Sequence, residues 1–243
     1  MAAPPGRAAV AVAHWSSCVQ LSIIIPARNE AAGIEPLLQQ LQPLRACGHE
    51  VILVDGGSTD ATTTLAQPLC DKVLTAPAGR ARQMNAGAQV ARGEVLWFLH
   101  ADSEMPADAG RLILDAVHDG HSWGRFDVRL SGSRRLLRTV GYLMNLRSRM
   151  TGIATGDQGI FVRRNLFLGI GGFADLPLME DIELTTRLKR QQRPACLRQQ
   201  LLTSSRRWEQ NGMLRTIALM WSLRLAWSLG VPAKRLAAYY DQG

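Results

Sequence analysis

The chain has 243 residues, of which 47% are hydrophobic and 20% charged, and this composition argues against overall disorder. Its formal net charge of +8 favours anionic partners such as nucleotides, nucleic acid or an acidic membrane surface. The four cysteines form no Cys-x-x-Cys pair, so a metal cluster and a disulfide framework are both unexpected, and the thiols are predicted to be those of a reduced, cytosolic protein.

The first part of the chain begins with an extension and continues as one strand–helix–strand unit. Residues 1–20 are rich in Ala and Pro, and we expect a poorly ordered extension rather than a signal peptide. Leu21–Ile25 is predicted to be a buried strand, and apolar residues from Ile34 to Leu44 recur at helical spacing. A second strand, Val51–Val54, starts about 30 residues after the first, which matches one βαβ unit.

The same alternation continues to the middle of the chain. Ser58, Thr59 and Asp60 are candidate N-caps for a helix that ends near Leu69. A further helix over Gly79–Arg92 precedes a third buried strand, Val95–Leu99. Alternating strands and helices indicate an α/β fold with a mostly parallel central sheet flanked by helices. No G-x-G-x-x-G follows the first strand, which disfavours a dinucleotide-binding oxidoreductase.

The second half of the chain is less regular and ends in a helical tail over residues 211–243. Arg134–Arg149 is predicted to be a helix with a basic face, and Met213–Val231 is an apolar helix interrupted by two arginines. The tail helix is expected to pack on a core or a partner, and the alternative is peripheral contact with the inner face of the cell membrane. The other predicted elements are strands over Trp123–Leu130 and Gln158–Val162, a helix from Leu178 to about Arg190, and a last helix that starts at Pro232.

Acidic residues follow two of the buried strands and begin one later helix. Asp55 follows the second strand, Asp102 follows the third, and Glu180-Asp181 stands at a predicted helix start. Ligands of open α/β sheets bind beyond the carboxyl ends of the strands, where the first two carboxylates should meet. Carboxylates at that edge of a basic chain suggest a metal and a charged nucleotide, although Asp55 could instead form a local Asx turn.

These motifs together resemble family 2 glycosyltransferases in their order and spacing. The resemblance covers roughly residues 20–210 and implies a GT-A fold over residues 21–210, in which a nucleotide-binding half and an acceptor half share one sheet. Gly79–Gly87 resembles a narrower group of small single-domain members associated with arsenosugar biosynthesis. The motifs are Leu21–Glu30 (L-S-I-I-I-P-A-R-N-E), Val54–Asp60 (V-D-G-G-S-T-D), His100–Asp102, Gly171–Phe173 and Glu180-Asp181.

The resemblance assigns one set of residues to the nucleotide sugar and its metal. Asp102 is the predicted ligand of a divalent cation, Mn²⁺ or Mg²⁺, because both ions prefer oxygen donors. His100 stands where the family's D-x-D motif has Asp, and it could ligate Mn²⁺, hydrogen-bond the nucleotide or serve the structure alone. The predicted nucleotide-sugar residues are Pro26, Arg28, Glu30, Asp55, Arg80, Asn85, His100 and Asp102.

Two further groups of residues complete the predicted site. Asp181 is the expected catalytic base and Glu180 the alternative, because adjacent helical residues point about 100° apart and only one is expected to face the acceptor. Arg80 begins a helix, where free N–H groups and the dipole favour a diphosphate. Arg82 and Asn85 lie on neighbouring turns, so the three residues cannot all contact the diphosphate. Arg207 and Trp208 resemble the diphosphate and acceptor contacts of processive relatives.

The sequence therefore predicts a metal-assisted, inverting glycosyltransferase. The expected donor is a nucleotide-diphosphate sugar, most simply a UDP-sugar, and the expected acceptor is a small or lipid-linked molecule. One alternative is a sugar-phosphate nucleotidyltransferase, although the glycine-rich phosphate loop that such an enzyme needs is absent after the first strand. The other is a non-catalytic protein that binds nucleotide sugars or nucleic acid, which leaves the acidic residues unexplained, so nucleic acid is not an expected partner.

Overall fold

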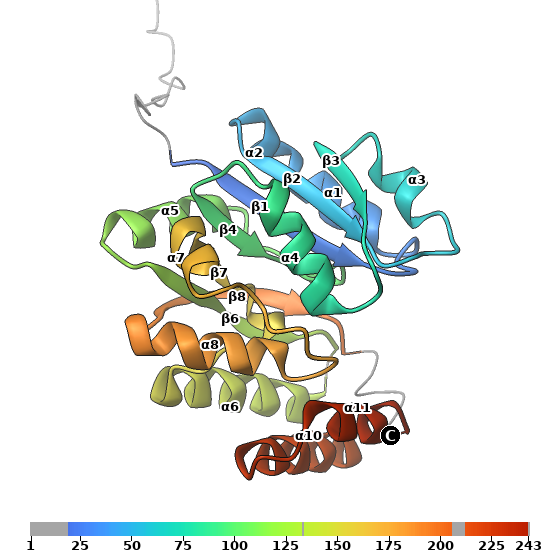
Figure 1. The fold of residues 1–243 in the computed structure, drawn as a ribbon, viewed down its shortest axis with the longest axis vertical. Coiled ribbons are helices and arrows are strands. Elements are labelled where there is room, and N and C mark those ends of the chain that lie inside the picture. Colours follow the sequence, from blue (N-terminus) through green and yellow to red (C-terminus); the bar gives the residue numbers. More distant parts are fainter. Residues whose placement is uncertain (1–18, 133, 206–211, 243) are drawn as a thin grey trace, which may run out of the picture.

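A computed structural model describes residues 19–132, 134–205 and 212–242, and one eight-stranded sheet runs through it (Figure 1). The strand order is β3-β2-β1-β4-β7-β6-β8-β5. The strands are β1 (Leu21–Ala27), β2 (Glu50–Asp55), β3 (Lys72–Thr75), β4 (Val95–Phe98), β5 (Ser103–Glu104), β6 (Trp123–Leu130), β7 (Phe161–Arg163) and β8 (Ala195–Thr203).

The sheet has a parallel half and a mixed half. β3, β2, β1 and β4 are all parallel, and Ala27 at the end of β1 pairs with Asp55 at the end of β2. Beyond β4 the sheet is mixed: β7 runs antiparallel to both β4 and β6, β8 is parallel to β6, and β5 is antiparallel to β8. The predicted parallel arrangement thus holds for the first half, which positions the ends of β1, β2 and β4 at one edge.

Helices cover both faces of the sheet, in agreement with the predicted α/β class (Figure 1). Each long predicted helix is present within a few residues of its expected bounds, and α5 was not predicted. The helices are α1 (Ile34–Gln40), α2 (Gln42–Ala46), α3 (Thr62–Ala66), α4 (Arg80–Val90), α5 (Ala109–His118), α6 (Arg135–Thr151), the 3₁₀ helix η1 (Gly156–Gln158), α7 (Arg164–Gly169), α8 (Glu180–Gln191), α10 (Met213–Ser228) and α11 (Ala233–Gln242).

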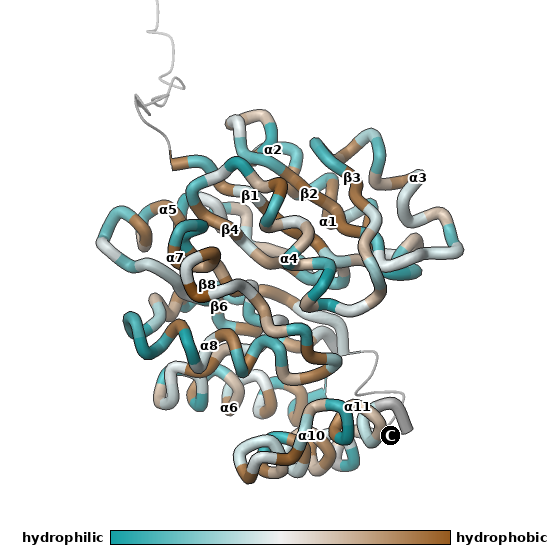
Figure 2. Tube along the Cα trace, in the orientation of Figure 1, coloured by the Kyte–Doolittle hydropathy of each residue, from teal (hydrophilic) through white to brown (hydrophobic). Residues whose placement is uncertain are grey.

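The central strands are buried on both sides because successive side chains point to opposite faces of the sheet. Ile23 and Ile25 of β1 belong to a core with α1, α3 and α5, whereas Ile24 belongs to a second core with α4, α7 and α8. This double burial explains why β1, β2 and β4 are continuous apolar runs, which appear brown in Figure 2. α4 and α8 both pack in the second core, on the same face of the sheet.

A buried charge network joins β6 to α6 beneath the second half of the sheet. The Arg125 side chain is fully buried and pairs with Asp127, which also accepts a hydrogen bond from Arg149 of α6. Asn145 of α6 donates to the carbonyl oxygen of Val128 over 2.9 Å. The predicted basic face on this helix holds only in part: Arg134, Arg135 and Arg138 are exposed, whereas Arg149 is turned toward the sheet.

The C-terminal helices α10 and α11 pack against the rest of the described chain through two small apolar clusters. Ile217 packs with Leu137 of α6, and Leu223 and Leu236 pack with Met179, the residue before α8. Among the described residues, no helix combines the length and the apolar character needed to cross a membrane. The hairpin of α10 and α11 therefore contacts the start of α8, where the candidate catalytic acids lie (Figure 1).

Candidate functional site

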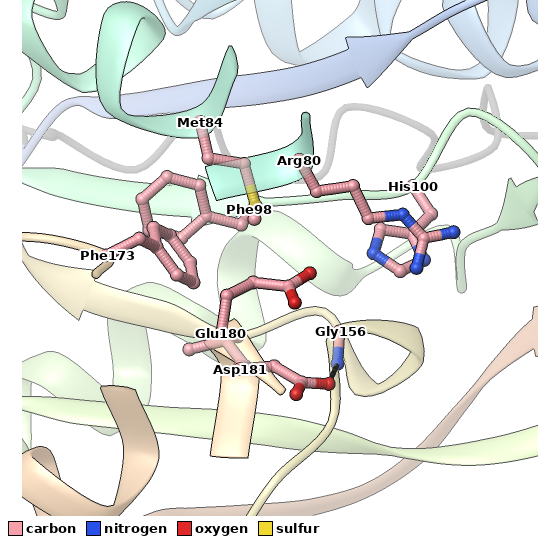
Figure 3. A pocket seen from close by; sticks show the side chains of 9 residues that line it. Arg80, Met84, Phe98, His100, Gly156, Phe173, Glu180 and Asp181 are labelled. Carbon is pink, nitrogen blue, oxygen red and sulfur yellow. Dashed lines mark hydrogen bonds between the residues drawn. The ribbon is translucent and has the colours of Figure 1, made fainter. Parts of the chain in front are cut away.

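A pocket between α4, β4 and the start of α8 collects several of the predicted residues (Figure 3). One wall is apolar and the other carries charged and polar groups. The lining residues are Arg80, Met84, Phe98, His100, Gly156, Ile160, Phe173, Glu180 and Asp181.

Glu180 and Asp181 both line this pocket, although adjacent helical residues were expected to point apart. They are the first two residues of α8, which follows Met179 in a left-handed conformation with φ of 69°. Side chains of a helix tilt toward its N-terminus, so residues of the first turn can project beyond the helix end. In Figure 3 the two carboxylates lie side by side, with Glu180 closer to Phe98 and Asp181 beside Gly156.

Backbone N–H groups hold the Asp181 carboxylate in place. Its Oδ2 accepts a hydrogen bond from the backbone N–H of Gly156 over 2.8 Å, and its Oδ1 accepts one from the N–H of Ile182 over 2.7 Å. Burial nevertheless raises the pKa of Asp181, and the negative charge of Asp157 adds to this increase. A fixed carboxylate with a raised pKa is suited to accept a proton from a bound molecule.

His100 is held between Asp157 and Gly156. Its Nδ1 lies 3.3 Å from Oδ1 of Asp157, and a Cβ atom added at Gly156 would lie 2.5 Å from its Nε2. Only glycine therefore leaves room for the imidazole at this place. Burial raises the pKa of Asp157, but the hydrogen bond from His100 and the charge of Arg80 outweigh it, so that the pKa is lowered overall.

Arg80 brings a positive charge to the mouth of the pocket. It is the first residue of α4, and although the residue as a whole is exposed, its guanidinium reaches into the site toward His100 (Figure 3). Desolvation lowers the pKa of Arg80, but Asp157 and Glu180 outweigh this effect and raise it. A cation beside free N–H groups at a helix start is favourable for a phosphate.

The pKa of Glu180, like that of Asp181, is raised in the pocket. Only 7% of its surface is exposed. Burial, followed by the charge of Asp181, raises its pKa from 4.5 to about 7. The folded protein therefore binds a proton more tightly than the unfolded chain, and this contribution to stability is present below pH 4.5 and is lost as the pH rises through about 7.

Replacing Glu180 with glutamine is expected to flatten the pH dependence of stability. Ionisation of Glu180 between pH 5 and pH 8 costs the wild type on the order of 3 kcal/mol, and the glutamine variant avoids this cost. Thermal unfolding followed across that range should show the wild-type Tm falling several degrees more than that of the variant. Glu35→Gln, at an exposed position of α1, is the matched control. Equal slopes for E180Q and the wild type would contradict the assignment.

The predicted nucleotide residues near β1 and β2 do not line this pocket. Asp55 ends β2, and its carboxylate accepts hydrogen bonds from the backbone N–H groups of Gly57 and Ser58, each over 3.0 Å. This is the Asx-type turn that the sequence left open. Its Oδ1 also accepts from the hydroxyl of Ser58 over 2.5 Å.

The loop after β1 is tied to the loop after β2. The side-chain Oδ1 of Asn29 accepts from the N–H of Thr59 over 2.8 Å, and the N–H of Glu30 donates to Oγ1 of Thr62 over 2.8 Å. Pro26 is buried within β1, whereas Arg28 is exposed just beyond it. These contacts place Arg28, Glu30 and Asp55 at the carboxyl ends of neighbouring parallel strands.

Asp102 is half-buried two residues beyond His100 and does not line the pocket. Within residues 19–132, 134–205 and 212–242, no group of three or more His, Cys, Asp or Glu side chains could hold a metal ion. Mg²⁺ commonly takes one or two carboxylates and fills its other positions with water and substrate phosphates. Asp102 fits a cation that is bound together with a diphosphate and does not fit a preformed metal cage.

The other predicted residues take different places. Asn85 faces Phe173 and makes two hydrogen bonds with its backbone, donating to the carbonyl oxygen over 2.8 Å and accepting from the N–H over 2.9 Å. Arg82 pairs with Asp175 over 2.8 Å. Of Arg80, Arg82 and Asn85, only Arg80 lines the pocket. Arg207 and Trp208 lie outside the described residues.

Sequence reasoning missed Gly156 and Asp157, which join His100 to Asp181. They belong to η1, whose capping box at Thr155 and Gln158 fixes the short helix. The signal that could have found them is the Thr155–Gln158 spacing, which is typical of a capping box and overlaps the predicted strand at Gln158. Phe173 and Met84 of the apolar wall stand within motifs of the family resemblance, whereas Phe98 was predicted only as part of a buried strand.

Comparison with known proteins gives a match to one family model over most of the sheet. The model described as "Glycosyl transferase family 2" matches residues 22–169. This stretch includes β1 to β7 and α1 to α6, and therefore contains Asp55, Arg80 and Asp102. It ends before α8.

Two curated relatives have names that describe the synthesis of a glucosyl lipid and the transfer of a sugar. The chain is 28% identical over 192 residues to a β-monoglucosyldiacylglycerol synthase from Synechocystis, covering 70% of this chain and 40% of the relative. It is 31% identical over 163 residues to an undecaprenyl-phosphate 4-deoxy-4-formamido-L-arabinose transferase from Pseudomonas fluorescens, covering 59% and 46%. The chain thus spans less than half the length of either relative.

A solved structure shares the fold. Glucosyl-3-phosphoglycerate synthase from Mycobacterium tuberculosis, in complex with Mn²⁺, UDP and glucosyl-3-phosphoglycerate, superposes with a TM-score of 0.63 at 19% identity. The superposition covers 88% of this chain and 81% of that one. The predicted GT-A fold is confirmed by this likeness.

Proposed function

This chain belongs to glycosyl transferase family 2, and on that premise we propose that it transfers a sugar from a nucleotide-diphosphate donor to an acceptor hydroxyl with inversion at the anomeric carbon. The observation that carries the proposal is the pocket in which two carboxylates of raised pKa, Glu180 and Asp181, lie across from the cation Arg80. A base and an anion-binding group on opposite sides of one pocket are what such a transfer requires.

In the proposed reaction Asp181 is the base. The acceptor oxygen attacks the anomeric carbon from the face opposite the diphosphate, a new carbon–oxygen bond forms, and the bond from that carbon to the diphosphate oxygen breaks. The hydroxyl proton passes to Asp181, and the nucleoside diphosphate leaves with the electron pair. The hydrogen bonds from Gly156 and Ile182 support this role, because they fix the carboxylate before the acceptor arrives. Glu180 remains the alternative base.

The proposed donor site joins the ends of β1 and β2 to the start of α4. Pro26, Arg28, Glu30 and Asp55 would surround the nucleoside, and Arg80 would face the diphosphate. A uridine nucleotide is the simplest donor, since the Mycobacterium tuberculosis relative of this fold holds UDP. Asp55 must then recognise the nucleoside with the part of its carboxylate that the Asx turn leaves uncommitted.

A divalent cation, Mn²⁺ or Mg²⁺, is part of the proposal. Asp102 would hold it together with diphosphate oxygens, and the cation would neutralise charge that develops on the leaving group. The pairing of His100 with Asp157 supports a positioning role for the imidazole rather than metal ligation.

The proposed acceptor is a small or lipid-linked molecule rather than nucleic acid. The name of the Pseudomonas fluorescens relative includes an undecaprenyl-phosphate group, which supports the lipid-linked option. A nucleic-acid surface on α6 would require all of its arginines on one exposed face. Arg149 does not lie on such a face, because it pairs with Asp127. We also propose a cytosolic location with peripheral contact at the membrane through α10, where Trp221 and Leu225 are exposed.

A screen of nucleoside diphosphates tests this function directly. Thermal unfolding is measured with UDP, GDP, ADP and CDP, each with and without Mn²⁺. A donor-site nucleotide present at about one hundred times its Kd should stabilise the fold by about 2.7 kcal/mol. The proposal expects a shift with at least one nucleotide, larger when Mn²⁺ is present. A screen in which no nucleotide shifts the transition would exclude the donor site.

Replacing Asp102 with alanine is expected to weaken the dependence on the cation. The variant should need roughly tenfold or more Mn²⁺ to reach the wild-type response to the best nucleotide, because outer partners and ligands of a metal typically contribute at least that factor. A titration with Mn²⁺ at fixed nucleotide measures the change. Asp108→Asn, at a surface pair with Arg111, serves as the control. An unchanged metal titration for D102A would remove Asp102 from the metal site.

A further inference from the structure

An apolar groove runs between α6 and α10 and is separate from the pocket described above. Its volume is about 390 Å³, within the range of about 300–1,000 Å³ that small-molecule sites occupy. The lining residues recur at helical spacing on both helices, which makes two facing apolar stripes. The apolar lining is mainly Leu143, Leu146 and Met150 from α6 and Ile217, Met220 and Trp221 from α10.

Several of these apolar side chains are exposed in the described structure. The exposed fraction is 48% for Leu143, 71% for Met150 and 67% for Trp221. Exposed apolar residues that gather in one concave place mark a binding surface more often than scattered ones do. The lining of this groove therefore suits an apolar chain.

A half-buried cation, Arg147, lines the groove. Nε and Nη2 of Arg147 are buried and have no hydrogen-bond partner among the described residues. Burial lowers the pKa of Arg147, and the charge of Arg125 adds to this effect, although Asp181 opposes it. A buried guanidinium without partners is costly unless a ligand completes its hydrogen bonds. An anionic group is the ligand that suits it.

The groove and the proposed catalytic pocket are separate but adjacent, because one residue of each forms a pair with the other. Asp157 lines the groove and pairs with His100, which lines the catalytic pocket. The neighbouring residue, Gly156, donates the hydrogen bond that holds Asp181. Arg147 interacts electrostatically with the same Asp181. A molecule whose anionic head group met Arg147 would thus present adjacent atoms to the proposed base.

We propose that this groove is the acceptor site, and that the acceptor is an amphiphile with one apolar chain and an anionic head group that carries the hydroxyl to be glycosylated. The chain lies between α6 and α10, the anionic group binds Arg147, and the hydroxyl faces Asp181. Arg224 at the α10 side of the groove adds a second positive charge. This inference rests on the proposed function, since it names the acceptor of the same reaction.

Three probes separate the parts of this acceptor. Oleoyl lysophosphatidic acid has the chain, the phosphate and a free hydroxyl, monoolein lacks the phosphate, and glycerol 3-phosphate lacks the chain. Isothermal titration of the full chain, below the critical micelle concentration, should give the tightest binding to lysophosphatidic acid. Burial of the chain should also give a negative heat-capacity change. Equal binding of monoolein and lysophosphatidic acid would overturn the role of Arg147.

Substitutions in the groove test its location. Leu143→Glu should weaken binding of lysophosphatidic acid roughly tenfold or more, because it places a charge among the apolar groups that meet the chain. Leu225→Glu is the matched control, since Leu225 is 62% exposed on α10 and does not line the groove. Retained binding in L143E, or an equal loss in L225E, would overturn the assignment.

Arg147→Met separates a ligand-binding role from a structural one. It removes an unpartnered buried charge, so the Tm should stay the same or rise while affinity for lysophosphatidic acid falls roughly tenfold to a hundredfold. A structural role predicts the opposite, a lower Tm with unchanged affinity. Arg138→Met, at an exposed position on α6, is the matched control and should change neither quantity.

The two proposals can fail separately. A wild-type response to UDP and Mn²⁺ without lipid binding would overturn the acceptor site and leave the donor site standing. Sedimentation that shows self-association in the wild type but not in L143E, together with absent lipid binding, would assign the groove to a second copy of the chain and also overturn the acceptor site. Lipid binding without any nucleotide response would instead contradict the proposed function.

Discussion

Replacing Asp181 with asparagine is expected to reduce sugar transfer by roughly a hundredfold or more while donor affinity changes by no more than a few-fold. The amide is nearly the same size as the carboxylate, and its oxygen can still accept the hydrogen bond from the N–H of Gly156. It cannot take the proton of the acceptor hydroxyl. Steady-state rates, with nucleotide affinity measured by calorimetry, give the two quantities.

Glu180→Gln is the informative companion to this variant. Both residues line the pocket, so a loss of transfer in E180Q with normal transfer in D181N would exchange their roles. An equal loss of transfer and of nucleotide affinity in D181N would move Asp181 from the chemistry to the donor site. The pH–rate profile adds a further check, because removing the base should abolish its limb of the profile.

Replacing Asp127 with asparagine is expected to lower the free energy of unfolding by about 3–5 kcal/mol. Arg125 is fully buried, and Asp127 is the carboxylate that pairs with it. The variant leaves this guanidinium without a compensating charge inside the core, where an unpaired ion is costly. It also releases Arg149 of α6. Equilibrium unfolding in urea measures the loss.

A double variant shows whether the unpaired charge is the cause. Arg125→Met combined with D127N removes both charges, and it should recover most of the stability lost in D127N, because apolar replacements of a buried pair are often neutral. Asp108→Asn, which breaks an exposed pair with Arg111, should cost less than about 1 kcal/mol. A double variant that is as unstable as D127N would show that Asp127 acts through other contacts.

Burial determined which strands could be predicted from the sequence. β1, β2 and β4 are buried along their whole length, so each is a continuous apolar run that ends in a polar turn. β8 was not predicted, because its centre includes exposed polar residues such as Gln199 and Gln200. β3 was not predicted either, because it is only half-buried. It is a strand because it pairs with β2, and this pairing leaves no pattern in its own sequence. Local periodicity also contains no information on strand order, which depends on distant pairings.

Part of the candidate site was predicted from local motifs, and the part that depends on contacts between distant residues was not. Glu180, Asp181, Arg80 and His100 were found by their family motifs, and the fold brings them to one pocket. The partners that orient them were not found, because Gly156 acts through its backbone and through the absence of a side chain. The position of Asn85 depended on Phe173, which is 88 residues away and could not be inferred from spacing.

Gly156 contacts both sides of the site at once. Its peptide N–H holds Asp181, and the space where a side chain would stand is filled by His100. A mutation that adds even one methyl group must displace the imidazole of His100 or shift the peptide that holds Asp181. The placement of His100 and the orientation of Asp181 are therefore coupled through a residue that has no side chain of its own.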